Sequence, residues 1–271
     1  MERELPQPDR DRLSVLTALV LVAYILTRVV VLPPATAEVR LLGLLVRVQV
    51  NTLSVMLALA GALAAAGADW LIRAHPWHPA GQSTRQHWIV PGLAALGAGA
   101  ILARIPEGPA WWIGLGLAAV LLLTVLVTEF VLVDADDPRY DGAAIGVTAL
   151  AYLLLAGSLY AIRASGLRAT FAIPLIFLAA TSVAWRLLLL DGPRPGTLAY
   201  AFVIGLAAAQ IAWGLHYWPI APLRWALMLG LAVYVGTGLI QAHLRGGIDR
   251  AARFEFSAVA VLALLGIAIL R

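Results

Sequence analysis

The chain has 271 residues, of which 62% are hydrophobic and 13% are charged, and its formal net charge is +4. This balance excludes a soluble globular domain of ordinary composition, because such domains are about 25% charged. The chain contains neither Cys nor Lys, which excludes disulfides, thiolate metal sites, cysteine nucleophiles, lysine Schiff bases and P-loop NTPases. Its arginines stand singly at the ends of apolar runs rather than in basic blocks, so we expect no nucleic-acid partner.

Residues 1–12 mix acidic and basic side chains with two prolines and predict a short cytoplasmic arm. Residues 13–271 predict a single integral membrane domain, an all-α transmembrane bundle of about nine crossings (roughly eight to ten) joined by short loops. The first crossing is expected over residues 13–32, because Pro33 and Pro34 end a helix there. It carries no A-x-A cleavage site, so we interpret it as a retained helix rather than a signal peptide.

Residues 38–72 contain no helix breaker, but a helix of that length is about 50 Å long, too long for one upright crossing. We therefore expect an amphipathic interfacial helix over residues 38–49, which carries Arg40 and Arg47 on one face and follows a cap at Thr36. The second crossing then runs over residues 50–71. The remaining crossings are expected over residues 88–102, 110–133, 142–162, 169–190, 197–218, 223–243 and 254–270.

The distribution of arginine predicts the orientation in the cytoplasmic (inner) membrane, because cytoplasmic loops carry an excess of Arg and Lys. With the N-terminus inside, slightly more arginines fall on the cytoplasmic side, and an odd number of crossings places the C-terminus outside. The inner set is Arg3, Arg10, Arg12, Arg73, Arg85, Arg194, Arg245, Arg250 and Arg253, and the outer set is Arg40, Arg47, Arg104, Arg163, Arg168, Arg224 and Arg271.

Polar residues inside apolar runs are the first candidates for function, since they are costly in hydrocarbon. Glu129 and Arg186 each lie about one turn from the inner end of a crossing, at the same depth, and Gln210 is expected to be buried in the seventh crossing. They predict a polar pocket, open to the cytoplasm, for an anionic or proton-coupled ligand. The alternative is that these side chains only snorkel to the head groups. The candidate ligand-binding residues are Glu129, Arg186, Gln210, Asp69, Gln241 and Glu255.

Four carboxylates follow the fourth crossing, at Asp134, Asp136, Asp137 and Asp141. Carboxylates together with a substrate phosphate are the ligands that Mg²⁺ prefers. The turn resembles the aspartate-rich motifs of UbiA-type intramembrane prenyltransferases, a resemblance that implies a metal-dependent enzyme acting on a polyprenyl phosphate. It departs from that family because it follows the fourth helix rather than the second, lacks the initial Asn-Asp and has no second such motif. The alternative is a solvated turn in which Asp141 caps the next helix.

The histidines predict no cofactor. His216 and His243 lie at opposite ends of their crossings and cannot share a haem iron. His75, His78 and His87 fall in one polar loop without a diagnostic metal-ligand spacing, and we expect this loop to be hydrated at the interface. Mg²⁺ at the acidic turn is therefore the single cofactor that the sequence suggests.

Three functional hypotheses follow from these patterns. The first is a membrane carrier or a bundle that binds a small ligand or lipid, with its polar pocket toward the cytoplasmic face. The second is an intramembrane enzyme with a metal at residues 134–141, although no catalytic residues are assigned. The third is a non-catalytic subunit or scaffold that packs against protein partners within the membrane. Membrane lipids are expected partners in every case.

Overall fold

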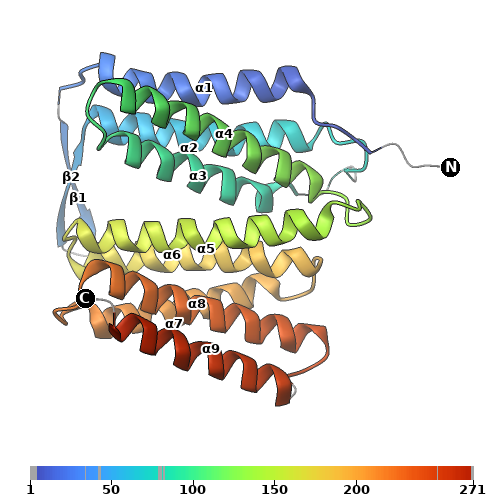
Figure 1. The fold of residues 1–271 in the computed structure, drawn as a ribbon. Coiled ribbons are helices and arrows are strands. Elements are labelled where there is room, and N and C mark those ends of the chain that lie inside the picture. Colours follow the sequence, from blue (N-terminus) through green and yellow to red (C-terminus); the bar gives the residue numbers. More distant parts are fainter. Residues whose placement is uncertain are drawn as a thin grey trace. The chain divides into compact units, whose positions relative to one another are not determined.

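The computed structural model describes residues 5–33, 35–41, 44–78, 81, 83–248 and 250–269. The chain divides into two compact units, unit 1 (Met1–Ala143) and unit 2 (Ala144–Arg271). Over the described residues the structure has nine α-helices, two short 3-10 helices and one two-stranded sheet (Figure 1). The helical fold is therefore confirmed, and its boundaries agree with the predicted crossings to within four residues.

The described residues of unit 1 form four α-helices, a β-hairpin and a short 3-10 helix. The first helix begins at Arg10, three residues before the predicted start at residue 13. The Asp9 carboxylate caps it by accepting hydrogen bonds from the backbone N–H groups of Asp11 and Arg12. Asn51 and Ser54 form a reciprocal capping box at the start of the second helix. The elements are α1 (Arg10–Val29), α2 (Thr52–Ile72), η1 (Arg85–Trp88), α3 (Ile89–Leu102) and α4 (Pro109–Val131).

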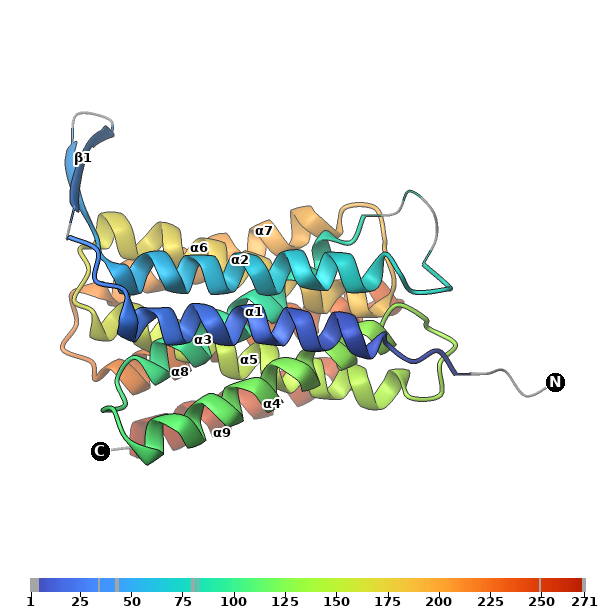
Figure 2. The same ribbon diagram turned by 90° about the horizontal axis from the view of Figure 1, so that it is seen from above.

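The predicted interfacial helix over residues 38–49 is wrong. The chain forms an antiparallel β-hairpin there, with β1 (Ala35–Leu41) paired to β2 (Leu44–Val50), at the end of unit 1 where α1 ends and α2 begins (Figure 2). Residues 46–50 read Val-Arg-Val-Gln-Val, an alternation with the period of a strand. In the register of this hairpin Glu38 lies opposite Arg47.

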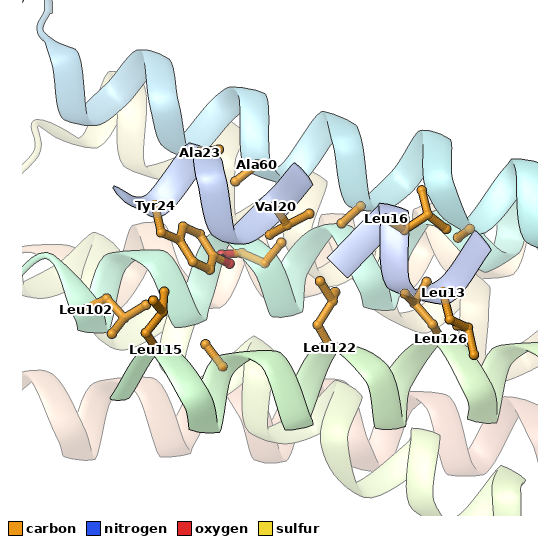
Figure 3. Packing of buried hydrophobic residues seen from close by; sticks show 14 of the residues in the cluster. Leu13, Leu16, Val20, Ala23, Tyr24, Ala60, Leu102, Leu115, Leu122 and Leu126 are labelled. Carbon is orange, nitrogen blue, oxygen red and sulfur yellow. The ribbon is translucent and has the colours of Figure 1, made fainter. Parts of the chain in front are cut away.

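The core of unit 1 forms where α1 packs against α2, α3 and α4. Figure 3 shows Leu13, Leu16, Val20 and Tyr24 of α1 in one cluster with buried residues of the neighbouring helices, including Leu122 and Leu126 of α4. Leu16 packs against Gly67 of α2. The hydroxyl of Tyr24 is buried in this cluster and donates a hydrogen bond of 2.6 Å to the backbone oxygen of Ala95, which satisfies the one polar atom of an otherwise apolar contact.

Two arginines of α1 show that successive helices of unit 1 run in opposite directions. Near the start of α1, Arg12 donates to the backbone oxygen of Trp70 at the end of α2. Near the end of α1, Arg28 donates to the backbone oxygens of Leu102 and Ile105, at the end of α3. The start of α1, the end of α2, the start of α3 and the end of α4 therefore share one end of unit 1, which we call the Arg12 end.

Unit 2 contains most of α5 and four further helices. Its closest seam joins α6 to α7, where Gly205 faces Thr181 and the backbone oxygen of Phe177. Gly238 similarly allows the ring of Phe256 to approach α8. The elements are α5 (Tyr140–Ala164), α6 (Ala169–Leu188), η2 (Leu189–Asp191), α7 (Thr197–His216), α8 (Pro222–Arg245) and α9 (Arg250–Ile269).

Seven helices of the described residues are long and apolar enough to cross a membrane, namely α1, α2, α4, α5, α6, α7 and α8. Between 22% and 39% of each spanning window is buried inside the protein, so most residues of these windows keep some exposed surface. Apolar helices with outward apolar surface fit a lipid solvent, because helices satisfy their backbone polar groups internally. The chain is therefore a multi-pass membrane protein, and a count of nine crossings stays a prediction.

Candidate functional site

Glu129 lies in the last turn of α4 with its side chain fully buried. Its Oε2 lies 2.7 Å from Nδ1 of His87, and the exposed fractions of the two side chains are 1% and 5%. His87 belongs to η1, which lies at the start of α3 and therefore at the Arg12 end. A carboxyl group and an imidazole in contact at such a buried position stabilise each other, either as an ion pair or by sharing one proton.

Asp69 of α2 holds η1 from another side. Its Oδ1 accepts hydrogen bonds from the hydroxyl of Thr84 and, at 3.3 Å, from Nε1 of Trp88. Its Oδ2 accepts from Nε of Arg73, one helical turn further along, at 2.8 Å. The short helix η1 is thus fastened to α2 through Asp69 and to α4 through Glu129. We call Asp69, Thr84, His87, Trp88 and Glu129 the η1 cluster.

The prediction of a hydrated histidine loop is wrong for two of its three histidines. His75 and His87 are both 4% exposed. The ring of His75 lies 4.3 Å from that of Phe130, and its Nδ1 accepts a hydrogen bond from the backbone N–H of Trp77. Burial lowers the pKa of His75, and the nearby carboxylate of Asp134 opposes that shift without reversing it. His75 is therefore a packed, neutral acceptor.

The acidic turn is ordered by its own hydrogen bonds. Asp137 is buried and binds Arg139 through both oxygens, Oδ1 to Nε at 2.9 Å and Oδ2 to Nη2 at 2.6 Å, which raises the pKa of Arg139. Asp134 accepts from the backbone N–H of Asp136, and Asp141 is exposed in the first turn of α5. Among the described residues, no group of three or more His, Asp or Glu side chains is placed to hold a metal ion.

Two candidate residues of unit 2 lie in different surroundings. Arg186 is buried in the last turn of α6 with 2% exposure. Its predicted pairing with Glu129 would join the two units and stays a prediction. Gln210 was expected to be buried but is exposed on α7. The run around Gln210 is apolar on every side, so its pattern does not indicate which helix face Gln210 occupies.

Two other candidates, Gln241 and Glu255, share one recess between α8 and α9. The recess has a volume of about 520 Å³, and Arg245 and Phe256 also line it. Gln241 donates to the backbone oxygen of Leu187 at 3.1 Å. We call this feature the α8–α9 recess.

Arg245 at the rim of this recess is held by a neighbouring carboxylate. Its Nε and Nη2 bind the two oxygens of Asp191 at 3.0 and 2.7 Å. The guanidinium is thereby fixed in orientation while its remaining N–H groups stay available. The guanidinium of Arg245 and the carboxylates of Asp191 and Glu255 therefore lie at or beside the α8–α9 recess.

Sequence reasoning missed several residues of both features. Asp69 was among the predicted ligand-binding residues, but its pairing with Arg73 was not predicted, although the two residues have the spacing of a pair on one helix face. Thr84 and His87 gave none, because their partners lie 15 and 42 residues away in the chain. Arg245 and Asp191 were likewise separated by 54 residues.

A family model matches residues 32–270 under the description "protein of unknown function (DUF5656)". The chain belongs to the DUF5656 family. The DUF5656 match includes the β-hairpin, the η1 cluster and the α8–α9 recess, so both polar features lie within the region that defines the family. Comparison with curated proteins and with solved structures gave no match.

Proposed function

We propose that this DUF5656 protein binds the headgroup of a membrane lipid, or a small ligand of the same chemistry, in the α8–α9 recess and carries it within the membrane. The observation that supports this proposal is the recess of about 520 Å³, which brings Gln241 and Glu255 together with Arg245. Polar groups that converge in a recess beside apolar side chains are typical of small-molecule sites.

The charges of the recess favour a zwitterionic headgroup. Arg245 contributes one positive charge, while Asp191 and Glu255 contribute two negative ones, and Asp191 is occupied by Arg245. Glu255 is then suited to an ammonium group, and the Gln241 amide with the remaining N–H groups of Arg245 is suited to a phosphate. A headgroup that carries an ammonium beside its phosphate satisfies both.

The proposed topology has nine crossings, with the N-terminus in the cytoplasm and the recess on the cytoplasmic side of the plasma membrane. The bonds of Arg28 to residues at the end of α3 support α3 as a crossing, because α3 then returns the chain between the same two ends as α1. The start of α9 lies against the end of α8 through Phe256 and Gly238, which supports α9 as the last crossing.

The experiment is native mass spectrometry of the full chain, purified in mild detergent and reconstituted with phosphatidylethanolamine or phosphatidylglycerol. We expect retention of phosphatidylethanolamine to fall about tenfold in Glu255→Gln and in Gln241→Leu, which is about 1.4 kcal/mol of binding free energy. Gln210→Leu is the matched control, because it makes the same change at an exposed position of α7. Equal retention by all four proteins would refute the proposal.

The alternative of a metal-dependent enzyme is less well supported, because Asp137 is occupied by Arg139 and Asp134 by the backbone of its own turn. Mg²⁺-dependent turnover of a polyprenyl phosphate that Asp136→Asn abolishes would favour it over lipid carriage. The scaffold alternative would gain support if neither lipid nor substrate bound and the chain purified in a fixed ratio with a membrane partner.

A further inference from the structure

A second, smaller cavity lies in unit 2 where α5 and α7 end and α8 begins. It has a volume of about 140 Å³ and is lined by Arg163, His216 and Trp225, together with apolar side chains of α5, the following loop and α6. We call it the Arg163 cavity. Trp225 lies in the first turn of α8 and Arg245 at its last residue, so about 30 Å of helix separates this cavity from the α8–α9 recess.

The guanidinium of Arg163 is fixed in place at this cavity. It donates from Nη1 to the backbone oxygen of His216 at 2.6 Å and from Nη2 to that of Trp218 at 2.8 Å. It also lies over the Trp225 ring, 5.6 Å from its centroid. These bonds use two of the five N–H groups of Arg163, so the cation is oriented without being neutralised.

Two buried nitrogens at the cavity have no partner in the described part of the chain. Trp225 is 0% exposed, and neither its indole Nε1 nor Nδ1 of His216 makes a hydrogen bond. An indole N–H can only donate, and a buried donor without an acceptor costs about 1–3 kcal/mol. Buried polar groups almost always have hydrogen-bond partners in native proteins, so the unpaired indole N–H of Trp225 indicates that an acceptor binds in the cavity.

The sequence around the cavity is cationic and contains no carboxylate. No Asp or Glu occurs between Asp141 and Asp191, or between Asp191 and Asp249. Arg168 precedes α6 as its N-cap and Arg224 lies in the first turn of α8. The N-termini of these two long helices add partial positive charge of their own. The positive charges around the cavity therefore favour a negatively charged acceptor.

We propose that the Arg163 cavity binds a phosphate-type oxyanion, with Arg163 and the N–H of Trp225 as its ligands and His216 as a third. The oxyanion is either free phosphate or the phosphate of a lipid headgroup, since both present the same oxygens. The volume is adequate, because a cavity of about 150 Å³ accommodates a benzene molecule, which has more heavy atoms than phosphate. The site is separate from the lipid-headgroup recess and does not depend on its function.

The test measures binding to the full chain in two arms. In the first arm, inorganic phosphate is titrated against the delipidated protein in detergent, followed by isothermal calorimetry. In the second arm, native mass spectrometry measures retention of phosphatidic acid and of phosphatidylcholine, whose phosphate is shielded by its choline group. We expect Trp225→Phe to weaken binding about tenfold, because it removes the donor and keeps most of the ring, and Arg163→Gln to weaken it at least as much.

The controls are Trp213→Phe and Arg250→Gln, which make the same changes at exposed positions of the same unit. If Trp225→Phe weakens the binding of inorganic phosphate but not the retention of phosphatidic acid, the ligand is free phosphate. If it weakens only the retention of phosphatidic acid, the ligand is a lipid phosphate. The proposal is overturned if neither ligand binds the parent protein, or if the controls weaken binding as much as the cavity variants. If Arg163→Gln does not fold, the comparison of Trp225→Phe with Trp213→Phe still decides.

Discussion

The two units hold their helices together by different means. In unit 1 two carboxylates have partners from neighbouring elements, Glu129 with His87 and Asp69 with Thr84 and Trp88. In unit 2 the closest seam, between α6 and α7, depends on Gly205 lying against Thr181 and the backbone of Phe177. Both kinds of contact can hold helices together in lipid, where helix association relies on close packing and interhelical hydrogen bonds. The two kinds of contact are sensitive to different substitutions. A buried pair is broken when one partner is removed, whereas a tight helix contact is disrupted when a larger side chain is introduced.

The largest effect is expected from breaking the buried pair of unit 1. Glu129→Ala leaves His87 buried without its partner, and removing one member of a buried pair costs about 3–5 kcal/mol. Chemical unfolding of the purified chain in detergent measures the loss. Glu107→Ala is the control, because Glu107 is exposed in the loop before α4. Replacing both partners with Leu should restore much of the stability, and a Glu129→Ala protein as stable as the parent would show that the pair does not fasten η1.

A smaller effect is expected from adding one methyl group to the seam of unit 2. Gly205→Ala places a Cβ against the hydroxyl of Thr181 and 3.0 Å from the backbone oxygen of Phe177. Neither neighbour can move easily, so we expect a loss of about 1–3 kcal/mol. Gly67→Ala in unit 1 should cost less, because its Cβ meets the flexible end of Leu16.

Gly157→Ala serves as the control for both glycine variants, since nothing lies within 4 Å of its added Cβ. We expect it to be neutral or slightly stabilising, because Ala is the better helix former. The three proteins are compared by chemical unfolding in the same detergent. If Gly67→Ala proved more damaging than Gly205→Ala, the two units would not differ in the way described.

Asp137→Asn tests the acidic turn at the border of unit 1. It removes the charge that binds Arg139, but the Arg139 side chain is 40% exposed and the ion pair is screened by water. We therefore expect a loss of about 1 kcal/mol, which is smaller at high salt. Glu107→Gln, which removes one carboxylate charge at an exposed position of the same unit, should leave the unfolding midpoint unchanged. An equal loss in both variants would mean that net charge rather than this contact stabilises the turn.

The smallest expected effect is the pH dependence contributed by His75. Its pKa in the folded chain is lowered by burial, so the unfolded chain binds the proton more readily. Stability from this group is complete above its ordinary pKa near 6.5 and falls as pH drops toward the folded value. His75→Gln should reduce the loss of thermal stability between pH 7.5 and 5.5, and His78→Gln should not. An unchanged pH profile in His75→Gln would exclude this contribution.

The sequence was sufficient for features that repeat along the chain and insufficient for those that depend on distant partners. Apolar runs located the helices. The positions of Gln241 and Glu255 along their helices predicted that both lie at the same depth, and both line one recess. The hairpin was missed because the spacing of Arg40 and Arg47 suggested a helix face, although residues 46–50 alternate. The burial of His87 was not predicted because its partner Glu129 lies 42 residues away in the chain. The exposure of Gln210 was not predicted because the helix around it is apolar on every face.

The shortness of α3 has a consequence for the surrounding bilayer. Its 14 residues cover about 21 Å, roughly 9 Å less than a typical hydrocarbon core. The polar groups of η1 fill part of that difference at the Arg12 end. In the proposed topology, in which α3 is a crossing, lipid acyl chains beside α3 therefore contact polar structure close to their headgroups, and the bilayer thins locally to accommodate the short helix. Membranes of shorter-chain lipids should accommodate unit 1 with less deformation than thick ones.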